Sequence, residues 1–205
     1  MPYIYLPPYD SPIEDIFAWN MSKYISTDAT MSAQVPVSTI GGNFILDFVL
    51  EHPNLNKVVV ECDGEEFHDI HKDEWRDAMI LGSGYAEAIY RIRGSDINYH
   101  MNDVLFIMSH IHPEIISNRG SINLNVLATK QAKSLDISDR QDEYVLNYDE
   151  EEIKNSHLLL TVRRHRIPKG QRRYWKTAYD FAVSVGGGSL DELMKKKYAL
   201  NSLDD

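Results

Sequence analysis

The stretch from Lys57 to Gly64, KVVVECDG, decides the fold of this chain. Three consecutive valines predict a central β-strand that is buried on both faces. The strand ends in two carboxylates, Glu61 and Asp63, which lie two residues apart and therefore point to the same face of the sheet. A carboxylate buried in a sheet is costly unless a partner neutralises it, so the end of this strand is a candidate functional site.

Two further strands are predicted upstream, over residues 33–39 and 44–50. Gly41-Gly42-Asn43 between them is typical of a hairpin turn. The second strand, FILDFVL, carries Asp47 among apolar neighbours. If this strand lies next to residues 57–63, Asp47 faces the two carboxylates at its end.

Helices and a fourth strand are predicted around this unit. Ser11-Pro12-Ile13-Glu14 is typical of a helix start, because the serine caps the helix and the glutamate completes a capping box. A helix is expected from about 69 to 81, a strand over 86–92, and a helix from about 95 to 109. Antiparallel strands followed by a crossover indicate a mixed α/β fold.

We interpret residues 1–115 as a core and residues 116–205 as a C-terminal extension. In the extension, residues 122–126 alternate like a strand, residues 157–162 also resemble a strand, and residues 171–185 have helical spacing. Gly186-Gly187-Gly188 predicts a hinge, and Ser189 with Glu192 predicts a capping box that opens a last helix.

Composition restricts the class of protein. The 205 residues are 43% hydrophobic and 25% charged, as in globular proteins. Apolar runs are far shorter than the roughly 20 residues that span a bilayer, and the N-terminus lacks the basic residues of a secretory signal. The single cysteine, Cys62, excludes an intramolecular disulfide and a multi-cysteine zinc site. We therefore expect a soluble cytoplasmic protein with no membrane partner.

Charge is distributed unevenly along the chain, whose net charge is −10. The acidic segment (136–152) contains eight acidic residues and one basic residue, whereas the basic segment (163–176) contains seven basic residues and no acidic one. Lysine and arginine neutralise phosphates, so the basic segment is a candidate nucleic-acid-binding surface. Its basic residues are Arg163, Arg164, Arg166, Lys169, Arg172, Arg173 and Lys176. A solvated face, or docking against the acidic segment, is the alternative interpretation.

The carboxylates of Asp47, Glu61 and Asp63 also predict a metal site. Mg²⁺ prefers oxygen ligands, and a divalent ion removes the repulsion between neighbouring carboxylates. Such a site suits phosphodiester hydrolysis, in which the ion polarises the phosphate and activates water. Without a metal, Glu61 and Asp63 would instead form salt bridges with Arg76 or Arg91.

A series of short motifs runs through residues 11–100. It comprises Glu14, Gln34, ILDF around Asp47, ECDG at 61–64, His68, the D-x-x-R formed by Asp73 and Arg76, and Arg91 after Gly84. In this order the motifs resemble the PD-(D/E)xK nuclease superfamily, most closely its branch related to the very-short-patch mismatch repair endonuclease. The resemblance implies a restriction-endonuclease-like mixed sheet flanked by helices, with Mg²⁺ or Mn²⁺ as the cofactor.

The resemblance also implies roles for individual residues. Asp47, Glu61 and the backbone carbonyl of Cys62 would bind the metal. His68 would take a proton from the attacking water, because an unperturbed imidazole titrates near pH ~6.5. Asp63 stands where most of the superfamily has lysine, a departure that the related branch shares.

Two further candidate catalytic residues each have a structural alternative. Glu14 would point from the first helix toward the metal, or would only complete the capping box. Lys72 lies one helical turn beyond His68 and would bring an ammonium to the phosphate, or would remain a solvated lysine.

The expected function is metal-dependent hydrolysis of DNA, by nicking or cutting. Two alternatives stay open: a catalytically inert nucleic-acid-binding protein on the same fold, which the missing lysine favours, and a nuclease that acts on RNA. A single site cuts one strand, so cutting both strands requires a homodimer or sequential nicks.

Overall fold

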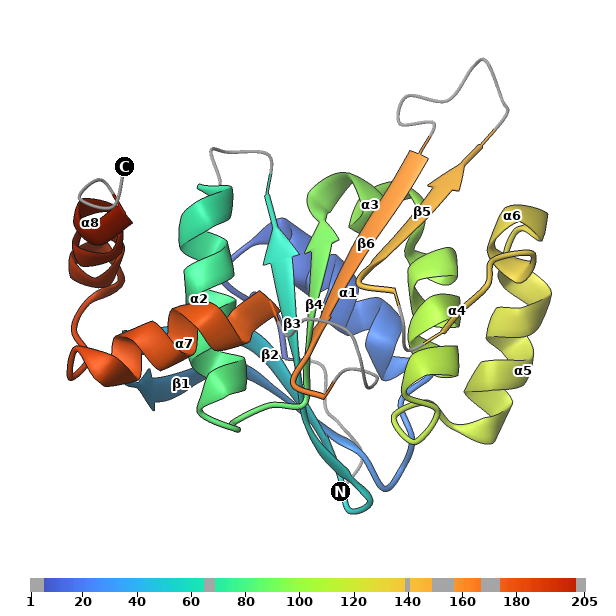
Figure 1. Ribbon diagram of the computed structural model, residues 1–205. Coiled ribbons are helices and arrows are strands. Elements are labelled where there is room, and N and C mark those ends of the chain that lie inside the picture. The colour runs from blue at the N-terminus through green and yellow to red at the C-terminus, as the bar shows by residue number, and fades with distance from the viewer. Residues whose placement is uncertain (1–5, 65–68, 139–140, 149–156, 167–173, 202–205) are drawn as a thin grey trace.

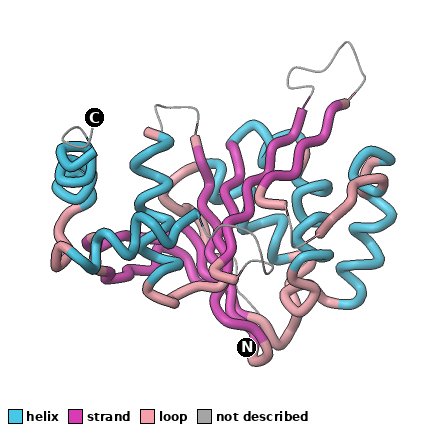
Figure 2. Tube along the Cα trace, viewed as in Figure 1, coloured by secondary structure: helices cyan, strands magenta, loops and turns pink. Residues whose placement is uncertain are grey.

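The computed structural model describes residues 6–64, 69–138, 141–148, 157–166 and 174–201. In these residues six strands form one mixed sheet with helices on both faces (Figures 1 and 2). The strands are β1 (Thr30–Thr39), β2 (Gly42–His52), β3 (Leu55–Asp63), β4 (Ala88–Arg93), β5 (Glu143–Asn147) and β6 (His157–Arg164). The helices are α1 (Pro12–Ser22), α2 (Ile70–Gly82), α3 (Gly94–Tyr99), α4 (Met101–Ile111), α5 (Asn118–Leu127), α6 (Lys130–Lys133), α7 (Tyr174–Ser184) and α8 (Leu190–Asn201).

The strand order is β1-β2-β3-β4-β6-β5. All neighbouring strands are antiparallel except β3 and β4, which are parallel and place Glu61 opposite Arg91. A parallel pair needs a crossover, and α2 supplies it between β3 and β4. The predicted mixed α/β architecture is therefore confirmed.

Two apolar clusters cover the two faces of the sheet. On one face, α1, α3, α4, α5 and α6 pack around Phe17, Phe48 and Tyr90. On the other face, α2, α7 and α8 pack around Met79 and Ile89. Residues 58–60 are fully buried, with Val59 in one cluster and its two neighbours in the other, so the prediction of a central strand is confirmed.

The chain beyond residue 115 completes the same sheet. Strand β6 pairs with β4, and β5 pairs with β6 at the edge. The strand predicted over 157–162 is confirmed, and part of the acidic segment forms β5. Helices α7 and α8 then cover the face on which α2 lies.

The strand expected over residues 122–126 is wrong, because these residues lie in the helix α5. The hydroxyl of Ser117 accepts a hydrogen bond from the backbone N–H of Gly120 at 3.0 Å and so caps the helix start. Ile122 and Val126 are exposed one helical turn apart, while Leu124 is buried. Three alternating apolar residues are too short a pattern to separate the two periods.

The helix expected from about 95 to 109 is instead two helices, α3 and α4, separated at His100. Within the described residues, we find no helix with the length and apolar character needed to cross a membrane.

The three glycines for which a hinge is predicted form the turn between α7 and α8. All three have positive φ angles, which glycine adopts at no steric cost. The backbone N–H of Gly188 donates to the carbonyl of Ile40 at 3.1 Å, which ties these glycines to the β1–β2 turn. The predicted capping box is also confirmed, because the Ser189 backbone N–H donates to Glu192 Oε2 at 3.0 Å.

Candidate functional site

Asp47 lies at a break in the regular alternation of β2. Phe48 and Leu46 are two residues apart, yet they pack into different apolar clusters. On the neighbouring strand, Gln34 has a positive φ of 53°, between the paired positions Ala33 and Val35. Asp47 Oδ2 accepts a hydrogen bond from the backbone N–H of Cys62 at 2.8 Å. The irregularity thus accompanies a direct tie between Asp47 and the end of β3.

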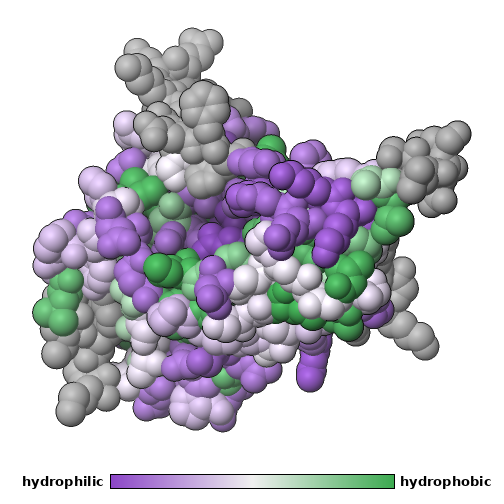
Figure 3. Space-filling view, turned by 90° about the vertical axis from the view of Figure 1, so that its left-hand side faces the viewer, coloured by the Kyte–Doolittle hydropathy of each residue, from purple (hydrophilic) through white to green (hydrophobic). Residues whose placement is uncertain are grey.

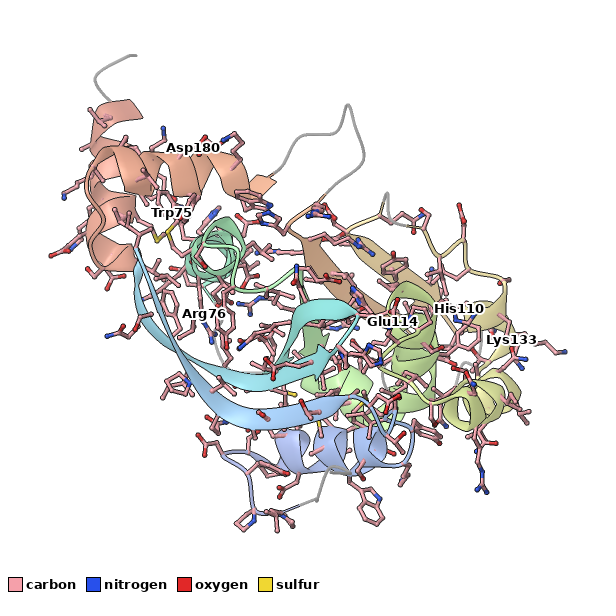
Figure 4. The ribbon with its side chains drawn as sticks, turned by 90° about the horizontal axis from the view of Figure 1, so that it is seen from below. Trp75, Arg76, His110, Glu114, Lys133 and Asp180 are labelled. Carbon is pink, nitrogen blue, oxygen red and sulfur yellow. The ribbon has the colours of Figure 1, made fainter. Side chains whose placement is uncertain are left out.

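Glu61 is buried and forms a two-pronged ion pair with Arg76 of α2. Nη2 of Arg76 lies 3.0 Å from Oε1, and Nη1 lies 3.0 Å from Oε2. Arg76 also donates to the carbonyl of Ile45 in β2 at 2.6 Å. Figure 4 shows Arg76 leaving α2 toward β1 and β2, whereas Trp75 leaves it in a different direction. Both oxygens of this candidate metal ligand therefore lie against the guanidinium of Arg76.

Asp63 points toward α2 like Glu61, as their spacing predicts. Its Oδ1 lies 2.9 Å from Nη1 of Arg91. Arg91 is buried and also contacts Asp73 at 3.2 Å and both oxygens of Asp77, at 2.9 and 3.1 Å. Arg163 of β6 lies 2.9 Å from Asp77 Oδ2. Glu61 and Asp63 thus have the salt-bridge partners that the sequence offered as an alternative to a metal.

Asp77 is the central member of this network that the sequence did not single out. Its side chain is fully buried, and it accepts from two arginines that lie on different strands. The feature of the sequence that could have identified Asp77 is its spacing from Asp73. The two residues are four apart and therefore lie on one face of a predicted helix.

Burial raises the pKa of both candidate metal-binding carboxylates. The pKa of Glu61 rises to about 8, since burial and the charge of Asp47 outweigh the attraction of Arg76. The pKa of Asp47 rises to about 6, since burial and the charge of Glu14 outweigh the hydrogen bond from Cys62. Both groups would be easier to ionise if a cation lay between them.

The donor set at this junction suits a hard divalent ion. Asp47, Glu61 and the carbonyl of Cys62 would all present oxygen atoms, which Mg²⁺ and Mn²⁺ prefer. Among the described residues, no group of three or more His, Cys, Asp or Glu side chains is arranged so that it could hold a metal ion. Arg76 contacts both oxygens of Glu61. A metal ion could therefore bind Glu61 only if it shared the carboxylate with Arg76 or displaced Arg76 from it.

Glu14 is buried beside this junction and contacts the N-cap residue of α1, Ser11. The hydroxyl of Ser11 accepts from the Glu14 backbone N–H at 3.3 Å and donates to Oε1 at 2.7 Å. The amide of Gln34 donates to Oε2 at 2.8 Å. The predicted cap by Ser11 is confirmed, although the Glu14 carboxylate accepts from the serine hydroxyl and not from its backbone N–H as in a capping box. The negative charge of Glu14 also raises the pKa of Asp47.

Lys72 is directed toward the last helix. Its Nζ lies 3.0 Å from Oδ1 of Asp191 in α8, and both side chains are largely exposed. His68, the predicted proton acceptor, lies outside the described residues.

The basic segment is only partly available for nucleic acid. Arg163 pairs with Asp77, and Lys176 lies 2.7 Å from Asp180. Arg164 is buried, donates to the hydroxyl of Tyr144 at 2.9 Å, and lies 3.7 Å from Asp142. Since Asp142 and Tyr144 belong to the acidic segment, Arg164 docks against it, as the alternative interpretation has it. Arg166 is exposed, and Lys169, Arg172 and Arg173 lie outside the described residues.

Comparisons with known proteins leave the site to be interpreted from its own geometry. No protein-family model matches the chain, no curated protein matches it, and no solved structure matches it.

Proposed function

We propose that this chain is a metal-dependent endonuclease that hydrolyses phosphodiester bonds in DNA on a restriction-endonuclease-like fold. The observation that carries the proposal is the junction of β2 and β3. There, Asp47 accepts from the Cys62 backbone N–H, and burial together with the charge of Asp47 raises the pKa of the neighbouring Glu61. A buried and a half-buried carboxylate that repel each other beside a backbone carbonyl favour a divalent ion.

In this proposal the residues of the chain would have separate roles. Asp47, Glu61 and the Cys62 carbonyl would hold Mg²⁺ or Mn²⁺, which supplies polarisation of the phosphate and a more acidic water. His68 would accept the proton of the attacking water. Arg91 holds Asp63 in place through its ion pair, which keeps the end of β3 in one arrangement.

A catalytically inert nucleic-acid-binding protein is the second candidate. The observation that favours it is that Glu61 and Asp63 already have arginine partners at 2.9 to 3.0 Å. Such pairs neutralise buried carboxylates without an ion. Metal binding separates the two candidates, because an inert core of this kind has no use for the ion.

Incubation with supercoiled plasmid, with and without Mg²⁺ or Mn²⁺, tests the proposal. We expect nicked or linear products only in the presence of the ion. Asp47→Asn and Glu61→Gln should abolish cleavage, whereas Asp28→Asn, which alters an exposed carboxylate in the turn before β1, should leave it unchanged. Cleavage by Asp47→Asn at the normal rate would contradict the assignment.

The same assay distinguishes the alternatives. Binding of DNA without cleavage under any ion condition supports the inert protein. Cleavage of RNA but not of plasmid assigns the activity to RNA.

A further inference from the structure

The charges of α8 are segregated along the helix. Asp191 and Glu192 lie in its first turn, and three consecutive lysines follow in the sequence DELMKKK. Both acidic residues are engaged: Asp191 pairs with Lys72, and Glu192 accepts from the Ser189 backbone N–H. The charges of Lys195 and Lys196 also help to lower the pKa of Glu192, after its hydrogen bonds with Ser189, so Glu192 offsets part of the lysine charge. With three lysines against one such acid, the later turns of α8 carry local positive charge on a chain whose net charge is −10.

Two of these lysines face solvent, together with an aromatic residue. Lys195 and Lys196 are exposed, and Tyr198 is 52% exposed. Lys197 is less exposed, with its Nζ lying 5.1 Å from the centre of the Phe181 ring. Figure 3 views the molecule from the side on which α8 lies, and it shows hydrophilic side chains gathered over the upper part of this face. We call Lys195, Lys196 and Tyr198 the α8 basic face.

The position of α8 is fixed relative to the candidate site. Lys72, which pairs with Asp191 at 3.0 Å, lies in the first turn of α2. Arg76, one helical turn further along α2, holds Glu61. The buried side chains of Leu190 and Leu193 pack α8 into the same apolar cluster as α2 and α7. Figure 1 accordingly shows α8 standing alongside α2.

This placement adds exposed positive charge to that of the basic segment, of which three described residues are already paired. Arg163 and Arg164 are committed to internal partners, and Lys176 pairs with Asp180. An acidic protein repels DNA over most of its surface, so binding depends on local positive charge near the site. Exposed lysines neutralise phosphates, and an exposed tyrosine hydroxyl donates to phosphate oxygens.

We propose that the α8 basic face binds the phosphate backbone of duplex DNA that lies across the candidate site. This inference rests on the proposed function for its choice of ligand. Two lysine–phosphate contacts supply the affinity, and the pairing of Lys72 with Asp191 sets the distance between these contacts and Glu61.

The test measures binding of a fluorescent duplex by anisotropy over a range of salt concentrations, without divalent ions. Each lost phosphate contact makes the slope of log affinity against log salt less negative by about 0.9. The Lys195→Ala/Lys196→Ala protein should therefore show a slope less negative by about 1.8, from two such contacts. Lys195→Arg/Lys196→Arg should keep the wild-type slope.

The matched control is Lys130→Ala/Lys133→Ala on α6, which removes the same charge. Figure 4 shows Lys133 at the opposite end of the molecule from Asp180 of α7, the helix that leads into α8. This control should keep the wild-type slope. An equal change of slope in the control would mean that only net charge matters, and would overturn the proposal.

Three other results would also overturn it. These are an unchanged slope in Lys195→Ala/Lys196→Ala, no binding of duplex DNA by the wild-type protein at low salt, or tighter binding of RNA with the same dependence on the two lysines. Failure of the proposed function is distinguishable from these, because a wild-type protein that binds DNA through α8 and never cleaves it would contradict only the nuclease activity. Circular dichroism of each variant checks that α8 remains folded.

Discussion

The carboxylate of Asp47 lies 2.8 Å from the backbone nitrogen of Cys62 and accepts its hydrogen bond. This contact joins β2 to the final residues of β3, where the chain presents Glu61 toward α2. It places a second, half-buried carboxylate beside Glu61, whose pKa is raised chiefly by burial and further by the charge of Asp47. The electrostatics of this junction lead to specific expectations for metal binding and for pH.

A divalent ion should stabilise the folded protein. An ion that binds only the folded state at a hundredfold excess over its dissociation constant adds about 2.7 kcal/mol to the free energy of unfolding. Thermal melts should therefore show a higher Tm with Mn²⁺ or Mg²⁺, and Asp47→Asn should abolish the rise. Asp28→Asn serves as the control and should retain it. An equal rise in Asp47→Asn would place the ion elsewhere.

Stability in the absence of metal should fall as pH rises from about 5 to 8. The pKa of Glu61 is about 8 in the folded protein against an ordinary value of 4.5, so between these values the folded state holds a proton that the unfolded state has lost. The free energy of unfolding then decreases with pH, by at most about 1.4 kcal/mol per pH unit for one proton. Asp47 adds to the fall below pH 6 for the same reason.

Urea denaturation at several pH values checks this expectation. Glu61→Gln cannot ionise and should show a flatter pH dependence than the wild-type protein. Superimposable pH profiles for the two proteins would show that Glu61 titrates normally in the folded state.

Arg91→Met should be strongly destabilising. It leaves Asp63 without this partner and removes one of the two arginines that neutralise the fully buried Asp77. Breaking a buried pair by removing one partner typically costs roughly 3–5 kcal/mol, measured as a lower midpoint in urea. Arg166→Met, at an exposed position, should change stability by less than about 0.5 kcal/mol.

The double variant Arg91→Met/Asp77→Asn identifies the cause. If the uncompensated charge of Asp77 is responsible, the double variant should be more stable than the sum of the two single effects predicts. Strict additivity would instead point to lost packing of the arginine side chain.

His68→Ala should slow cleavage by roughly 10²–10⁴-fold, because general base catalysis contributes about that much. DNA affinity should barely change, since a neutral imidazole adds little attraction for phosphate. Single-turnover cleavage and anisotropy binding measure the two quantities separately. Normal cleavage by His68→Ala would remove His68 from the mechanism.

Local signals in the sequence determined the elements that position the candidate site. The valine run predicted a buried central β3, the Gly41-Gly42 pair predicted the hairpin, and the serine–glutamate spacing predicted the starts of α1 and α8. These signals act within a few residues, through backbone sterics and capping hydrogen bonds, so they can be interpreted without a partner. The strand expected at 122–126 failed because its pattern was too short to distinguish two periods.

Only the tertiary structure decided which charges meet. Asp77 and Arg163 are 86 residues apart, and their contact exists because β6 pairs with β4 in the sheet and the Arg163 side chain lies on the face that α2 covers. The same strand placement turns Arg163 and Arg164 into internal partners, although the sequence shows only a run of basic residues. Strand order and register depend on contacts between distant segments, and a shift of one residue moves a side chain to the other face. The sequence by itself therefore determined the local elements and their candidate carboxylates. The packing of α2 against the sheet decided that Glu61 pairs with Arg76, and the parallel pairing of β3 with β4 decided that Asp63 pairs with Arg91.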